Sequence, residues 1–276
     1  MEKTQICANL NRLPGDSQRR LSYTRMVMLL VGIEILVSIV VTLSVSALSN
    51  YIQDILKCIK ILTIISVVIA DMSALLLLAV PKIRLLLPLN LIILIVYTIS
   101  ASFMAGLPFA CMSIPWELAS WGTTLLLFFS TVVGGAFIRV NLMGYWLSIF
   151  LFLVFEFIAV LVTTIVLYTL VEFEIAMTVF GGGMAVMMII LAIISGQMTF
   201  GRPGLRTIDP DYCLASLILH AILLLLFVVS SVEFYFTLGA DPSKCTNNIS
   251  GFFHFVNTRF VCHSVIEWLT VVRYLF

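Results

Sequence analysis

Seven stretches of this chain, each about 20 residues long, carry almost no charge. A helix of about 20 apolar residues spans the ~30 Å hydrocarbon core of a bilayer. Only a helix or a closed barrel satisfies every backbone N–H and C=O there, and these uninterrupted runs lack the alternation of barrel strands. The sequence therefore predicts an all-α, polytopic membrane protein. Its expected spans are Met26–Leu48, Ile61–Val80, Leu85–Leu107, Leu118–Ile138, Tyr145–Leu167, Ile175–Ile194 and Cys213–Val232.

The composition leaves little room for anything except this membrane domain. Hydrophobic residues make up 62% of the chain and charged residues 11%, whereas a soluble globular domain is about 25% charged. We expect a seven-helix domain at 26–235, between a polar N-terminal segment at 1–25 and a tail at 236–276. The first apolar run is long enough to act as a signal anchor. The predicted partner is the lipid bilayer, and the net charge of +1 gives no sign of nucleic acid.

Basic residues predict the orientation, because Lys and Arg accumulate in cytoplasmic loops. With the N-terminus inside, ten Lys and Arg fall on the inner side and five on the outer side. The N-terminus is therefore expected in the cytoplasm, and seven spans place the tail in the lumen or outside the cell. Glu117 falls in an expected outer loop.

The tail carries features that suit an outer location. Asn248 begins the glycosylation sequon Asn-Ile-Ser. Cys245 and Cys262 are a candidate disulfide, because such bonds persist in oxidising compartments. The segment Phe252–Phe276 is predicted to be interfacial or re-entrant, and if it spans, the C-terminus returns to the cytoplasm. The six cysteines show no metal spacing, so neither a metal nor a cofactor is predicted.

Ionisable residues within membrane spans are costly and are functional hypotheses by default. The candidate ion path consists of Asp71, Glu156, Glu34 and His220. Asp71 and Glu156 lie near span centres, with no Lys or Arg at comparable depth. They are either protonated, hydrogen-bonded carboxyls or the lining of a path for cations or protons. His220 either titrates near physiological pH or forms a hydrogen bond across helices.

Enzymatic signatures are missing from the sequence. It contains no HExxH, no nucleophile elbow around a serine, no phosphate-binding loop and no Gly-x-Gly-Asp of a membrane aspartyl protease. No catalytic residue is predicted, and we expect a protein that is not an enzyme.

A series of short motifs follows one order along the chain. It comprises Lys82-Ile-Arg84, Pro88-Leu-Asn90, Tyr97-Thr-Ile-Ser100 and Gly106, then Gly196-Gln197, Ile208-Asp-Pro-Asp-Tyr212 and the helix that begins at Cys213. This order resembles the transmembrane Bax inhibitor motif family, and its lifeguard branch in particular. The resemblance implies a seven-helix bundle of Bax inhibitor type in the endoplasmic reticulum, the Golgi or the plasma membrane. It also implies a slow Ca²⁺ leak, a role in calcium homeostasis and apoptosis, and membrane partners from cell-death pathways.

The family associates its leak with two Asp residues, one in each of the last two helices. The corresponding positions here are Ser195 and Ile222, and neither carries an acid. The pH-gated mechanism of the family therefore does not carry over. We predict weak cation permeation past Asp71 and Glu156. The alternatives are a non-conducting scaffold, or a transporter of a small solute or protons that uses Glu34, Glu156 and His220.

Overall fold

The protein is described by a computed structural model that defines residues 14–49, 55–80, 83, 86, 88–110, 112–140, 142–170, 173–200 and 212–237. In this part of the chain, seven helices are long and apolar enough to cross a membrane. The elements are α2 (Pro14–Ser49), α3 (Ile55–Ala79), α5 (Leu89–Gly106), the short 3₁₀ helix η1 (Leu107–Phe109), α6 (Ile114–Phe137), the 3₁₀ helix η2 (Leu142–Tyr145), α7 (Trp146–Leu170), α8 (Phe173–Phe200) and α9 (Tyr212–Thr237). The all-α, seven-helix prediction is confirmed, and the protein is an integral membrane protein.

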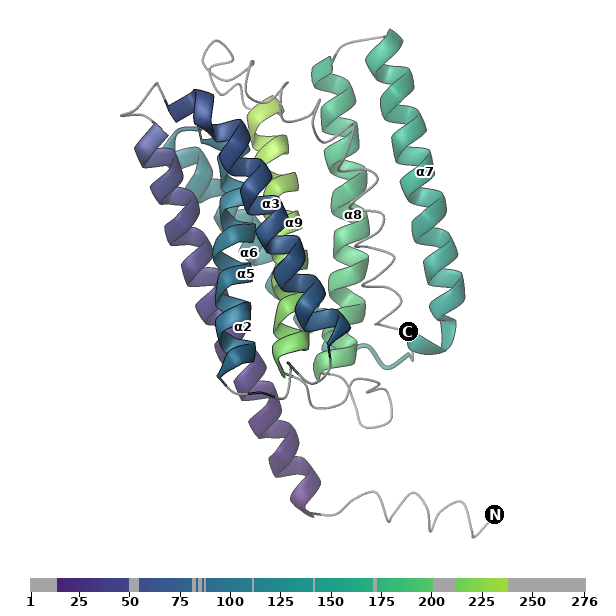
Figure 1. The fold of residues 1–276 in the computed structure, drawn as a ribbon. Helices are drawn as coiled ribbons and strands as arrows, with labels where there is room; N and C mark the ends of the chain where they lie inside the picture. Colours follow the sequence, from purple (N-terminus) through teal and green to yellow (C-terminus); the bar gives the residue numbers. More distant parts are fainter. Residues whose placement is uncertain are drawn as a thin grey trace.

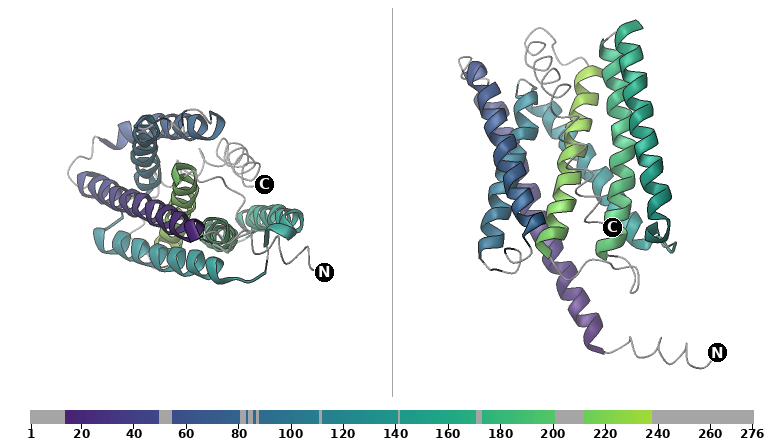
Figure 2. Two further views of the ribbon diagram at one scale, coloured as in Figure 1. Left: turned by 90° about the horizontal axis from the view of Figure 1, so that it is seen from below. Right: turned by 45° about the vertical axis from the view of Figure 1, so that its right-hand side comes forward.

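Helix α9 occupies the centre of the bundle (Figures 1 and 2). It packs against α2, α5, α6 and α8, and 78% of its span is buried, compared with 6% of the span in α7. Helix α7 lies at the edge and makes its extensive contacts with α8. The polar side chains of α9 therefore meet those of several helices, whereas α7 turns most of its surface to lipid.

Most helices extend beyond the predicted spans, and the extensions of α2 and α6 at their N-terminal ends matter most for the site. Helix α2 starts at Pro14, within the predicted polar segment, and its first turns project past the other helices (Figure 1). Helix α6 starts at Ile114 instead of Leu118, after Ser113 and with a proline in its first turn, where proline's missing N–H costs nothing. The earlier start places Glu117 inside the helix.

Small residues bring helices α6 and α8 into backbone contact. A Cβ atom added to Gly135 would lie 2.1 Å from the carbonyl oxygen of Ile193, and one added to Gly196 would lie 2.3 Å from the carbonyl oxygen of Val132. Close approach of this kind is how helices associate in lipid, where no hydrophobic force drives them together. Helices α6 and α8 are thus closely packed, and both contact α9.

Gln197 fixes the connection that follows α6. Its side-chain Nε2 donates to the carbonyl of Val140 at 2.6 Å, and its Oε1 accepts from the backbone N–H of Leu142 at 3.0 Å. Because these backbone groups lie outside a regular helix, they need such partners. Gln197 therefore has a structural role in the bundle.

Several predictions fall outside the described residues. These are the sequon at Asn248, the disulfide between Cys245 and Cys262, and the placement of the tail.

Candidate functional site in the bundle core

Every fourth residue along the middle of α2 is polar and buried. These residues are Glu34, Ser38, Thr42 and Ser46, with exposed fractions of 4%, 0%, 0% and 1%. Positions i and i+4 lie on one face of a helix. This polar stripe faces inward, so side chains of α5, α6 and α9 meet it.

Glu34 is held near the middle of the span Ser22–Leu48 by hydroxyl groups of two other helices. Its Oε2 accepts a hydrogen bond from Ser216 of α9 at 2.5 Å, and its Oε1 lies 3.4 Å from Thr98 Oγ1 of α5. Thr98 also lies 2.8 Å from the carbonyl oxygen of Leu94. Since a threonine has one hydrogen, its donation to Leu94 leaves the Thr98 oxygen as an acceptor. A protonated Glu34 carboxyl can then donate to it.

One turn further along the stripe, Ser38 contacts His220, Ser102 and the backbone of Glu34. Ser38 Oγ lies 2.8 Å from His220 Nε2, 2.8 Å from the carbonyl oxygen of Glu34 and 2.7 Å from Ser102 Oγ. Ser102 also reaches the carbonyl of Thr98 at 2.6 Å. The two serines have fewer hydrogens than neighbouring acceptors, so the chain of hydroxyls has more than one arrangement of its hydrogens.

Apart from its bond to Ser38, His220 has an aromatic neighbour and an unpaired ring nitrogen. Its ring is fully buried, and the ring of Tyr97 meets it edge-on with centroids 5.7 Å apart. Its Nδ1 has no hydrogen-bond partner. An imidazole with one hydrogen on Nε2 leaves a bare acceptor at Nδ1, which costs less than an unpaired charged N–H.

This arrangement can hold a proton at Glu34, whose carboxyl is linked to Ser38, Ser102 and His220 through the backbone carbonyls of Glu34 and Thr98. Six buried side chains take part: Glu34 and Ser38 on α2, Thr98 and Ser102 on α5, and Ser216 and His220 on α9. No ion pair reaches Glu34 from the described residues, so its charge is balanced by a proton or stabilised by hydroxyl donors alone. We call these six residues the Glu34–His220 network.

The C-terminal half of the stripe meets a second buried acid, which the sequence predicted to lie in a loop. Glu117 of α6 is 1% exposed, and its carboxyl lies against Thr42 and Ser46. Thr42 also accepts a hydrogen bond from the indole of Trp121 at 2.9 Å. The Glu–Thr–Ser contact could have been suspected from the i, i+4 polar spacing in the first span, but α6 was predicted to begin one turn too late.

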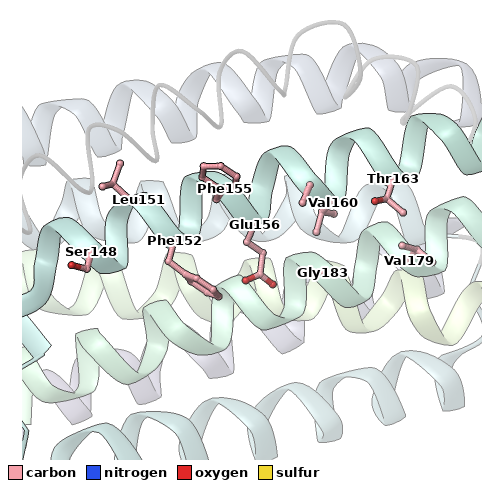
Figure 3. A pocket seen from close by; sticks show the side chains of 10 residues that line it. Ser148, Leu151, Phe152, Phe155, Glu156, Val160, Thr163, Val179 and Gly183 are labelled. Carbon is pink, nitrogen blue, oxygen red and sulfur yellow. The ribbon is translucent and has the colours of Figure 1, made fainter.

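The two acids predicted to line the ion path, Asp71 and Glu156, lie on separate helices. Asp71 is half-buried on α3, where it has a polar interaction of its own. Glu156 is half-buried on α7 and lines a groove of about 810 Å³ between α7 and α8. Figure 3 shows its carboxyl directed from α7 toward α8, near Gly183. The two helices lie apart in the bundle (Figures 1 and 2), so these acids do not share a site.

The two positions that correspond to the family's acids are both buried. Ser195 lies on α8, and its hydroxyl has no hydrogen-bond partner; Ile222 lies on α9 within the apolar core. Helices α8 and α9 pack together. The neighbouring helices are therefore in place, but apolar packing occupies the position where the family has its second acid.

No family model, no curated protein and no solved structure matches this chain. Its function is therefore inferred from the side chains that the bundle brings together.

Proposed function

We propose that this integral membrane protein is a lifeguard-like regulator of calcium homeostasis, in which the Glu34–His220 network controls a weak cation leak. The observation that carries the proposal is a buried polar cluster at mid-membrane in which hydroxyls from three helices contact a carboxyl on one side and an imidazole on the other. The order of sequence motifs supports the family. The network would replace the missing pair of acids at Ser195 and Ile222.

The proposed control depends on the proton of Glu34. A carboxylate accepts hydrogen bonds from Ser216 and Thr98, whereas a protonated carboxyl must donate one of them. A change of protonation therefore reorders hydroxyls on α5 and α9 together. Because Glu34 and His220 lie on α2 and α9, the same event alters the contact between an outer helix and the central helix. The network is buried, so the leak requires a rearrangement of these helices.

The experiment measures Ca²⁺ efflux from vesicles that contain the purified protein, at mildly acidic and mildly alkaline pH. We expect the leak of the wild-type protein to depend on pH. Glu34→Gln should remove this dependence and fix the leak at the rate of the protonated form. The matched control is Asp71→Asn combined with Glu156→Gln, which removes two intramembrane acids outside the network and should leave the pH dependence unchanged.

Two results would contradict the proposal. If the leak of Glu34→Gln still depends on pH, the network does not control it. If the control variant loses the leak, cations instead permeate past Asp71 and Glu156.

A non-conducting scaffold is the second candidate, and the position of α7 favours it. Helix α7 packs mainly on α8 and has half-buried Glu156 in an outward groove, which suits contact with another membrane protein. A wild-type protein that passes no Ca²⁺ at any pH would select this candidate.

A further inference from the structure

Glu156 is a mid-membrane acid that the described bundle leaves without a polar partner. It lies near the middle of the span Trp146–Leu170, of which 6% is buried. Within the described ranges, no side chain forms a hydrogen bond or an ion pair with its carboxyl. Lipid tails offer no hydrogen-bonding group at this depth, where an unsatisfied polar group is costly. The matching polar group therefore has to come from outside the described bundle.

The carboxyl opens into a groove of about 810 Å³ that runs along α7 beside α8 (Figure 3). Ser148 and Thr163 also line this groove, about two turns before and after Glu156, and both are exposed. Thr164, by contrast, donates to the carbonyl of Val160 in its own helix at 2.7 Å. The groove therefore presents three polar groups along one side of α7, and Glu156 is the ionisable one among its described lining residues.

Each of these three groups can pair with a copy of itself. A hydroxyl and a protonated carboxyl both donate and accept a hydrogen bond. Two copies of one chain cross the bilayer in the same direction, so a two-fold axis along the membrane normal brings each residue near the axis opposite its counterpart at the same depth. A foreign helix with one basic residue would match Glu156 and leave the two hydroxyls unmatched. A second copy of this chain matches all three groups.

We propose that α7 is the interface of a homodimer, in which the protonated carboxyl of Glu156 pairs with the partner's Glu156 at mid-membrane. Each carboxyl donates one hydrogen bond to the other and accepts one from it, so both gain a polar partner. Ser148 and Thr163 fall opposite their counterparts in the same interface. Because each carboxyl carries a proton, the pair brings no net charge into the membrane.

Apolar and small side chains around Glu156 suit close contact between two helices. Phe152 and Phe155 are 55% and 78% exposed, and both line the groove, where a second copy would cover them. Ala159 lies about one turn from Glu156 and is also exposed. Small residues of this kind let helix backbones approach each other in lipid. Since α7 lies at the edge of the bundle and packs mainly on α8, a second copy reaches it without moving the other described helices (Figure 2).

The test measures dimer formation by the purified full-length protein in liposomes, as energy transfer between two differently labelled preparations. We expect the wild-type protein to dimerise. Glu156→Leu removes both hydrogen bonds of the carboxyl pair and should weaken dimerisation about tenfold or more. Glu156→Gln should retain the dimer, because an amide also donates and accepts. The matched control is Ile165→Ala, which changes an exposed side chain of α7 outside the groove and should leave dimerisation unchanged.

A charge exchange identifies the contact residue. Glu156→Lys alone should stay monomeric, because its dimer would place two positive charges together in the membrane. A mixture of Glu156→Lys and the wild-type protein should form a mixed dimer, since a positive charge then faces a carboxylate across the interface.

Three results would overturn the proposal. If the wild-type protein stays monomeric in liposomes, the groove has a different occupant. If Glu156→Leu dimerises as well as the wild-type protein, the two copies meet at another surface. If the mixture with Glu156→Lys gives no energy transfer, Glu156 does not face its counterpart. These results are independent of the leak, because the Glu34–His220 network lies on helices that α7 does not contact extensively.

Discussion

The contact between α6 and α8 makes a sharp prediction for two adjacent glycines. Gly135→Ala adds a Cβ atom that would lie 2.1 Å from the carbonyl oxygen and 2.9 Å from the carbonyl carbon of Ile193. Carbon atoms in good contact lie about 3.5–4.0 Å apart. The obstacle is backbone, so the helices must separate by about 1 Å or more to reach such a distance. Gly134→Ala is the matched control, because a Cβ atom there would meet nothing within 4 Å.

The two substitutions are expected to change the free energy of unfolding in opposite directions. Overpacking a well-packed contact costs about 1–3 kcal/mol, and an obstacle of backbone atoms places Gly135→Ala toward the upper end of this range. Both substitutions gain up to about 1 kcal/mol because alanine is a better helix former than glycine. The net result is a loss of about 1–2 kcal/mol for Gly135→Ala and a gain of up to about 1 kcal/mol for Gly134→Ala.

The assay is thermal or detergent-induced unfolding of the two purified variants beside the wild-type protein. Gly196→Ala, whose Cβ would meet the carbonyl oxygen of Val132 at 2.3 Å, should lower stability as Gly135→Ala does. The double variant should cost less than the sum, because one separation of the helices accommodates both methyl groups. If Gly135→Ala and Gly134→Ala unfold at the same midpoint, the helices do not meet through their backbones at this point.

Three further substitutions test single polar contacts. Trp121→Phe removes the donor to Thr42 but keeps an aromatic ring in the stack, and should cost about 0.6–1.7 kcal/mol, the range measured for hydrogen bonds between membrane helices. Ser216→Ala removes a donor to Glu34 and should cost about 1–3 kcal/mol, since a buried carboxyl loses a partner. Gln197→Ala should speed amide exchange in the connection after α6, as read by hydrogen–deuterium exchange, because the backbone there loses its side-chain partner.

A control exists for the loss of a serine hydroxyl as such. Ser44 is exposed on α2 and bonds only to the carbonyl of Val40 in its own helix. Ser44→Ala should therefore change the unfolding midpoint little. An equal effect of Ser44→Ala and Ser216→Ala would show that the Ser216 hydroxyl bound to Glu34 has no special energetic role. Unchanged amide exchange in Gln197→Ala would show that Gln197 does not stabilise the connection after α6.

The membrane spans were predictable because bilayer thickness constrains length and composition together. The helix boundaries were harder to predict than the spans, as α6 shows. Pro115 and Trp116 were expected in a loop, but a proline is tolerated in the first turn of a helix, and α6 begins at Ile114. This shift of one turn moved Glu117 from an expected outer loop into the interior.

The site was harder to predict than the spans, because depth in a span says nothing about which way a side chain faces. Asp71 and Glu156 lie deep in apolar sequence, yet their helices are separate and Glu156 faces an outward groove. Glu34 and His220 are 186 positions apart in the sequence numbering, and the central place of α9 brings Ser216 to Glu34 and His220 to Ser38.

One periodicity in the sequence did carry the missing information. Glu34, Ser38, Thr42 and Ser46 recur every four residues in an otherwise apolar helix, and so do Thr98, Ser102 and Gly106 on α5. The two series meet in register, with Thr98 near Glu34, Ser102 at Ser38 and Gly106 against Thr42. In lipid, polar groups on one helical face gain most when they meet partners on another helix. Matched polar series on two spans therefore indicate a shared interface, and they would have selected Glu34 over the acids whose helices have no such series.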